Sequence, residues 1–185
     1  MFHLGIDNGV SGSIGLIRPG GAATYIKMPT LESLSYTKAK KFINRVDWKT
    51  LYALLGAEVG PYFCMIERPM VQAARFNATL SAIRAVEATL IVLEKLCIPY
   101  EFVDSKQWQR TLLPSGLWMM KKDKNGRGHL KADRDELKTA SLSVGKRLFP
   151  SVDFTGFKDA DGLLIAEFAR RTYMVSNPPM SGKGR

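Results

Sequence analysis

Two short apolar runs in this 185-residue chain each end in a carboxylate, and this pattern constrains the fold more than any other feature of the sequence. Residues 2–6 (FHLGI) precede Asp7, and residues 62–66 (YFCMI) precede Glu67. Short apolar runs bounded by turn residues predict buried strands. We therefore expect a fold whose core strands present acidic side chains at their ends.

Two more acids, Asp159 and Asp161, stand where a C-terminal helix is expected to begin. Two bare carboxylates about 4 Å apart repel by roughly 4 kcal/mol at an effective dielectric constant of about 20, so a cluster of them needs a compensating charge. Oxygen ligands without clustered His or Cys suit Mg²⁺ or Mn²⁺ better than Zn²⁺. Metal-assisted phosphodiester chemistry is therefore the leading hypothesis. Asp near a helix N-terminus is also favourable for purely local reasons.

Length and charge limit the classes of protein that fit. The length is typical of one domain with a substantial core. A formal net charge of +10 and a pI near 9.7 favour nucleic acid or another polyanion as partner. We expect a soluble, intracellular protein, because neither a signal peptide nor an 18-residue uncharged apolar stretch is seen. Cys64 and Cys97 have no metal-binding spacing and are expected to be buried free thiols.

Periodicity and turn residues predict an alternation of strands and helices. The expected strands are 2–6, 13–17, 23–27, 62–66 and 99–103; the expected helices are 38–46, 48–55, 78–97, a short one through 108 and 112, 133–148, and one starting at 159 or 161. The long helix 78–97 could serve a dimer interface or simply pack on the sheet.

Glycine and basic residues mark the connections. Gly5 and Gly15 would allow close backbone approach inside the strands. His3, in the first strand, is expected to be a hydrogen-bonded core histidine. Residues 121–129 are polar and basic and predict a mobile loop. We expect one folded domain over 1–174 and a disordered basic tail over 175–185.

Three stretches carry a family resemblance when they are taken together and in order. They are 5–12 (GIDNGVSG), 65–69 (MIERP) and 161–167 (DGLLIAE), supported by 138–141 (KTAS) and 147–150 (RLFP). They resemble RuvC-type Holliday junction resolvases, most closely the small bacteriophage and organellar enzymes. The resemblance covers most of residues 2–174. It implies an α/β, ribonuclease H-like fold with a mixed five-stranded sheet flanked by helices.

The same resemblance implies an activity. Such a protein would be a homodimeric endonuclease that binds branched DNA, especially four-way junctions, and nicks two opposing strands symmetrically. Its cofactor would be Mg²⁺, with Mn²⁺ as a substitute, and two ions per site would be bridged by Asp7, one activating water and the other stabilising the leaving oxygen. No membrane and no nucleotide cofactor are expected. The protein would work in the cytoplasm of a bacterial or phage-infected cell, or in an organelle.

Asp7, Glu67 and Asp161 match the family's catalytic and metal-binding acids, while the fourth position is open. Relatives carry that acid three or four residues before the last one, where this chain has Lys158 and Phe157. Asp159 is the preferred fourth acid, and it can share a site with Asp161 only if the helix has not yet begun between them. The alternatives are that Asp153 reaches in, or that three acids are modified by Lys158.

DNA contacts are expected from basic residues beside the strand ends and in the basic loop. If about six phosphates are neutralised, log affinity should fall with log salt with a slope near −5. Phe76 could stack on unpaired bases or act as a hydrophobic staple. The DNA-binding candidates are Arg68, Arg75, Phe76, Lys106, Lys121, Lys122, Lys124, Arg127, Lys131 and Lys138.

Three rival functions remain open at this point. An actin-like ATPase or sugar kinase shares a strand, Asp and Gly start, but needs two such lobes. A catalytically weak or inactive junction-binding protein would fit the uncertain fourth acid. A ribonuclease H-like nuclease could instead act on other branched DNA or on RNA–DNA hybrids.

Overall fold

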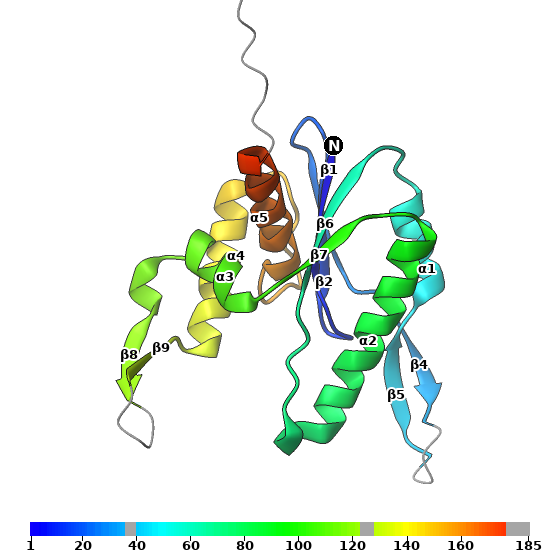
Figure 1. Ribbon diagram of the computed structural model, residues 1–185, viewed down its shortest axis with the longest axis horizontal. Helices are drawn as coiled ribbons and strands as arrows, with labels where there is room; N and C mark the ends of the chain where they lie inside the picture. The colour runs from blue at the N-terminus through cyan, green and yellow to red at the C-terminus, as the bar shows by residue number, and fades with distance from the viewer. Residues whose placement is uncertain (36–39, 123–127, 177–185) are drawn as a thin grey trace, which may run out of the picture.

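A five-stranded mixed sheet forms the centre of the molecule (Figure 1). The computed structural model describes residues 1–35, 40–122 and 128–176, with backbone alone at 73, 121, 122 and 128–131. The strand order is β3-β2-β1-β6-β7; β2 is antiparallel to β1 and β3, whereas β6 is parallel to β1 and β7. The strands are β1 Phe2–Asp7, β2 Ser13–Ile17, β3 Ala23–Lys27, β6 Tyr62–Glu67 and β7 Tyr100–Val103. The predicted mixed five-stranded sheet is confirmed.

Helices cover both faces of the sheet and create two cores (Figure 1). On one face lie α1 (Trp48–Gly56) and α2 (Phe76–Lys95), preceded by a 3₁₀ turn, η1, at Ala73–Arg75. On the other face lie α3 (Ser105–Leu112), α4 (Arg134–Leu148) and α5 (Asp161–Ser176); a second 3₁₀ turn, η2, spans Ser115–Leu117. Both faces of β1 and β6 are therefore buried, which explains their continuous apolar sequence.

Glycines bring the backbone of α5 into direct contact with the sheet. A Cβ added to Gly5 would lie 2.1 Å from Ala166 N, and one added to Gly15 would lie 2.3 Å from Leu163 Cα. From the helix side, a Cβ on Gly162 would lie 2.6 Å from the carbonyl oxygen of Ser13. No side chain fits at these distances, so the predicted close approach at Gly5 and Gly15 is confirmed, and the first turn of α5 is fixed against β1 and β2.

The prediction of a helix over 38–46 is wrong. Thr30–Leu34 (β4) and Phe42–Val46 (β5) instead pair as an antiparallel hairpin, and α1 begins only after Asp47. Asp47 Oδ1 accepts the backbone N–H groups of Lys49 and Thr50, which stops α1 from extending backwards. The nearby lysines suggested a solvated helix face, but an aromatic residue and two β-branched residues within 42–46 favour a strand once a partner strand is present.

Two further expectations need correction. Within the predicted loop over 121–129, residues 121–122 belong to strand β8 (Met119–Lys122) and residues 128–129 to strand β9 (Gly128–Lys131), which pair with each other, while 123–127 lie outside the described residues. Cys64 is fully buried, but Cys97 is exposed: α2 ends at Lys95, and Cys97 adopts a left-handed φ of 54° in the following turn. α5 continues to Ser176, and the rest of the predicted tail lies outside the described residues.

Helix α2 is unusually apolar for a helix with so much exposed surface. Among the helices that the structure describes, it is the one long and apolar enough to cross a membrane, with a mean hydropathy of 1.4 in a window that is 28% buried. One side of α2 packs on the sheet, with Val92 and Leu93 buried. Core helices of soluble proteins share this composition, so the helix carries no membrane assignment.

Candidate metal centre

Parallel pairing of β1 and β6 places the first two acids at one edge of the sheet. The register pairs Ile6 with Ile66, so that Asp7 and Glu67 follow at the carboxyl ends of neighbouring strands. Their charges interact, since the Glu67 carboxylate contributes to the raised pKa of Asp7. The expected convergence of these two side chains is therefore present.

The start of α5 supplies the other two acids. Helix α5 begins at Asp161, and Asp159 lies before it, with Asp159 Oδ1 3.5 Å from Asp161 N. One carboxylate oxygen each from Asp7, Asp159 and Asp161 lie within 4.8 Å of one another. Two ligands of one Mg²⁺ lie at most about 4.2 Å apart, twice the bond length, so adjustments of under about 1 Å would let these oxygens share an ion. The condition that the helix not begin between Asp159 and Asp161 is met.

The cluster carries more negative charge than the protein compensates. Burial, followed by repulsion from Glu67 and Asp159, raises the pKa of Asp7 to about 7. Burial likewise raises the pKa of Glu67 to about 7 and that of Asp161 to about 7, with the neighbouring carboxylates adding to the effect. Raised carboxyl pKa values in a group of acids are typical of functional sites, where a bound cation supplies the missing charge.

Hydrogen bonds from the α3–α4–α5 side hold two of the acids in place. Trp108, fully buried in α3, donates its indole N–H to Glu67 Oε2 at 2.8 Å. The Ser141 hydroxyl of α4 donates to Asp161 Oδ1 and accepts the backbone N–H of Ala160 at 3.1 Å. Each contact fixes one oxygen of a carboxylate. Neither Trp108 nor Ser141 was among the sequence-predicted site residues.

Lys138 lies inside the acid cluster. Its Nζ is 2.9 Å from Asp159 Oδ2, and this contact raises the pKa of Lys138. The Tyr25 hydroxyl lies 3.3 Å from Asp159 Oδ1 and donates to Ser13 Oγ at 2.9 Å. The structure places Lys138 against an acid at the edge of a groove, and its expected contact with DNA stays a prediction. Lys138 lies three residues before Ser141, a spacing that puts both side chains on one face of α4. This spacing was the signal in the sequence that could have placed both residues at the site.

Neither alternative for the fourth acid, Asp153 or a three-acid site modified by Lys158, is supported as well as Asp159. Asp153 is exposed and accepts the backbone N–H of Thr155 at 2.8 Å within its own loop. Lys158 is exposed and lines a groove beside Asp159. The geometry therefore favours Asp159, although catalytic roles for Asp7, Glu67, Asp159 and Asp161 stay predictions.

Basic residues line grooves on both sides of the acids. A groove of about 510 Å³ contains Glu67, Arg68, Arg75 and Arg134. A second groove of about 440 Å³ contains Asp159 and three lysines, Lys27, Lys138 and Lys158. The predicted contacts Arg68 and Arg75 thus lie beside the site, with Arg68 also 3.4 Å from Asp104.

The other DNA-binding candidates are less closely placed. Phe76 is 70% exposed at the start of α2, and Lys106 is exposed on α3 outside the lining of both grooves. The backbone puts Lys121 and Lys122 in β8 and Lys131 in β9. Lys124 and Arg127 lie outside the described residues.

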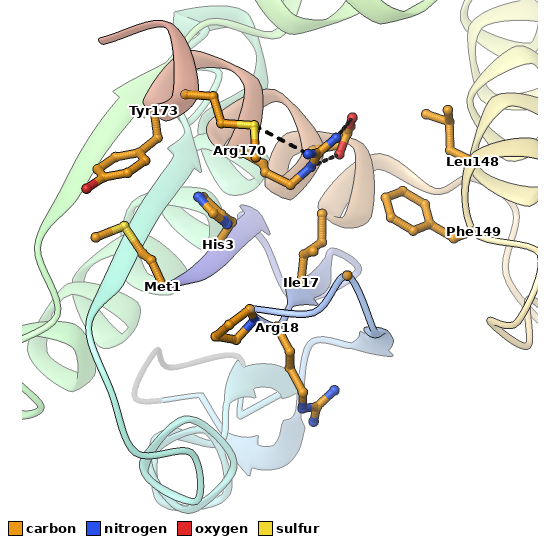
Figure 2. A pocket seen from close by; sticks show the side chains of 12 residues that line it. Met1, His3, Ile17, Arg18, Leu148, Phe149, Arg170 and Tyr173 are labelled. Carbon is orange, nitrogen blue, oxygen red and sulfur yellow. Dashed lines mark hydrogen bonds and ion pairs between the residues drawn. The ribbon is translucent and has the colours of Figure 1, made fainter. Parts of the chain in front are cut away.

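The opposite end of the sheet holds a different buried acid. A pocket of about 680 Å³ lies between the start of β1 and the last turns of α4 and α5 (Figure 2). There Glu167, 3% exposed, accepts two hydrogen bonds from Arg170 and one from Arg171 at 2.7–2.8 Å. His3 also faces this pocket; it is buried, but its Nε2 has no hydrogen-bond partner among the described residues, contrary to expectation.

Strand order, flanking helices and acids at the strand ends define a ribonuclease H-like fold. Within that class, two solved structures of RuvC are similar to the chain over nearly its whole length. Thermus thermophilus RuvC in complex with a Holliday junction substrate has a TM-score of 0.58 and 10% identity, covering 96% of each chain. A further structure of RuvC from Thermus thermophilus has a TM-score of 0.50 and 14% identity, covering 95% of this chain and 96% of that one. No protein-family model and no curated protein matches the sequence. The chain therefore has a RuvC-type fold.

Proposed function

We propose that this protein is a structure-selective DNA endonuclease that resolves four-way junctions by divalent-metal-dependent phosphodiester hydrolysis. The observation that carries the proposal is the convergence of Asp7, Asp159 and Asp161 oxygens within 4.8 Å, beside Glu67, on a RuvC-type fold. An all-oxygen donor set in a chain with a net charge of +10 fits a hard cation facing a polyanion.

Asp7, Glu67, Asp159 and Asp161 would hold the metal, with Mg²⁺ as the expected ion. A bound divalent cation would lower the pKa of a water and neutralise charge on the phosphate. The protein's own residues prepare the site. Trp108 and Ser141 orient one oxygen each of Glu67 and Asp161, which leaves the other oxygens to bind metal. Lys138, already beside Asp159, adds a positive charge next to the phosphate position.

Pairs of cuts require two sites, and α2 offers a surface for a second copy. Its outward side exposes three large apolar residues, Phe76, Ile83 and Ile91, at 70%, 41% and 58%. An apolar stripe of this kind on a soluble protein marks an interaction surface. We infer a homodimer, in which two active sites at a fixed separation would select substrate by shape. Ile83→Glu with Ile91→Glu should give a folded monomer by light scattering; an unchanged mass for a dimeric wild type would place the interface elsewhere.

The decisive experiment offers matched four-way, three-way and linear DNA, and an RNA–DNA hybrid, with Mg²⁺ or Mn²⁺, and maps every cut. Paired symmetric nicks near the crossover of the four-way junction are expected, and none with EDTA. Metal-dependent cutting of the hybrid alone would replace the proposal with a different ribonuclease H-like activity. Binding without any cutting would leave a junction-binding protein.

The proposed place of action is the cytoplasm of a bacterial or phage-infected cell, or an organelle.

A further inference from the structure

A third groove lies away from the acids, between the β4–β5 hairpin and α2. It has a volume of about 620 Å³. Lys41, Phe42, Arg45 and Trp48 line one side, and Asn77 and Leu80 of α2 line the other. Neither Lys41 nor Arg45 was among the DNA-binding candidates, because this segment was expected to be a helix whose lysines face solvent.

The chemistry of this groove suits an unpaired nucleic-acid strand. Its lining contains cations and no acid among the described residues. Phe42 is 69% exposed and Trp48 is 46% exposed, so both rings are available to a ligand. Aromatic rings bind unpaired bases by stacking, while Lys and Arg neutralise phosphates. A duplex hides its base faces, and the surface proposed above for a second copy, Phe76, Ile83 and Ile91, does not line this groove.

The groove adjoins the two grooves beside the proposed active site. Val10, in the turn that follows Asp7, lines this groove and both grooves beside the acids. The β4–β5 hairpin and the first turn of α2 project from the same end of the sheet as the carboxyl end of β1 (Figure 1). A strand leaving the acids past Val10 would enter the groove directly.

We propose that the groove between β5 and α2 binds nucleotides that are unpaired at the branch point of the substrate, next to the scissile phosphate. Lys41 and Arg45 contact their phosphates, and Phe42 and Trp48 stack on their bases. This assignment rests on the proposed nuclease function, and it adds a subsite that orients the branch point of the substrate relative to the acids.

Binding measurements test the contribution of the cations. Lys41→Ala with Arg45→Ala should weaken binding of a fork with an unpaired strand about tenfold and reduce the salt slope by about 1.4, since each single-strand phosphate contact contributes about 0.7. The matched control is Lys146→Ala with Arg147→Ala, which removes the same charge from the far end of α4. Equal affinity and equal slope for the two variants would overturn the proposal. All four side chains are exposed, so folding should be preserved.

Cross-linking tests which molecule occupies the groove. Phe42→Cys is prepared in a Cys97→Ser background and labelled with a photoreactive maleimide; the remaining Cys64 is fully buried. Illumination with the fork should give an adduct on the unpaired strand. An adduct only with a second protein copy, only with duplex, or with nothing would overturn the proposal.

The proposed nuclease function and the proposed role of the groove can be disproved separately. If the wild type neither binds nor cuts any branched DNA, the nuclease function falls and the groove assignment falls with it. If the wild type cuts junctions but the groove variant behaves like the Lys146/Arg147 control, the groove assignment alone falls.

Discussion

The two ends of the central sheet treat buried acids in opposite ways. At one end Glu167 is enclosed by Arg170 and Arg171; burial alone would raise its pKa, but the hydrogen bonds from the two guanidinium groups hold it below the usual value. At the other end Asp7, Glu67 and Asp161 have raised pKa values, with Lys138 the one cation bonded to the group among the described residues.

This contrast separates structure from function within one fold. Glu167 has its charge and its hydrogen bonds satisfied by the protein and needs no ligand. The acids at the ends of β1 and β6 are held close together at an energetic cost, which a stable protein keeps only where a ligand offsets it. The contrast fits a stabilising role for Glu167 and supports the proposed metal-binding role of the acid cluster, and both roles can be tested.

Removing one acid of the metal centre should have the largest effect. We expect Asp7→Asn to lower the rate of junction cleavage by at least roughly 10³-fold, because several kcal/mol of transition-state charge stabilisation would be lost. Junction binding measured in EDTA should not change. Asp153→Asn is the matched control and should cut at the wild-type rate. Comparable cleavage by Asp7→Asn would remove this residue from the metal site.

The stability of the metal-free protein should depend on pH in a direction set by the acid cluster. Asp7, Glu67 and Asp161 have folded pKa values of about 7, above their ordinary values of 3.8 to 4.5, so the folded state binds more protons between about pH 4 and 7. Their contribution to stability is therefore fully present below about pH 4 and is lost as the pH rises through 7. Glu167, with a lowered pKa, contributes in the opposite sense.

We expect the Tm to fall between pH 5 and pH 8 in EDTA by several degrees, at about 2–4 °C per kcal/mol for a chain of this size. Mg²⁺ at pH 8 should restore it. Asp7→Asn should flatten the pH dependence in EDTA. A wild-type Tm that rises over this range, with Asp7→Asn following the same curve, would show that the cluster does not control it.

Glu167→Gln should destabilise the protein without harming the chemistry. The substitution leaves Arg170 and Arg171 without their carboxylate, and we expect a loss of about 2 kcal/mol. That value is below the range for a fully buried pair, because the two arginine side chains are 33% and 45% exposed and can reach water. Urea unfolding measures the loss, and cleavage well below the Tm should match the wild type. A large drop in cleavage by folded protein would contradict the contrast between the two ends.

Loss of the indole donor should have the smallest effect. Trp108→Phe keeps most of the packing but removes the hydrogen bond to Glu67, and we expect about tenfold weaker Mg²⁺ binding, as for other contacts that orient metal ligands. Calorimetric titration of metal into the protein gives the readout. Trp118→Phe is the control, since Trp118 Nε1 has no hydrogen-bond partner among the described residues. Equal metal affinity in the two variants would reduce Trp108 to a packing residue.

The parts of the fold and site that follow from local sequence were predictable. The strands that end before Asp7 and Glu67, the hairpin of 2–6 with 13–17 and a helix starting at 159 or 161 all depend on apolar runs and turn residues close in the chain, whereas the parallel pairing of β1 with β6 does not. The contacts of Trp108 and Lys138 depend on how α3 and α4 lie against the sheet, which periodicity does not specify. The strand β5 was missed for the same reason, because Phe42–Val46 is stabilised by pairing with Thr30–Leu34.

The direct contact between α5 and the sheet has a consequence for how such a protein diverges. Asp161 is held beside Asp7 by main-chain atoms packed at Gly5, Gly15 and Gly162, so its position depends little on which larger side chains fill the two cores. Core side chains can therefore be exchanged while Asp161 stays in register with Asp7.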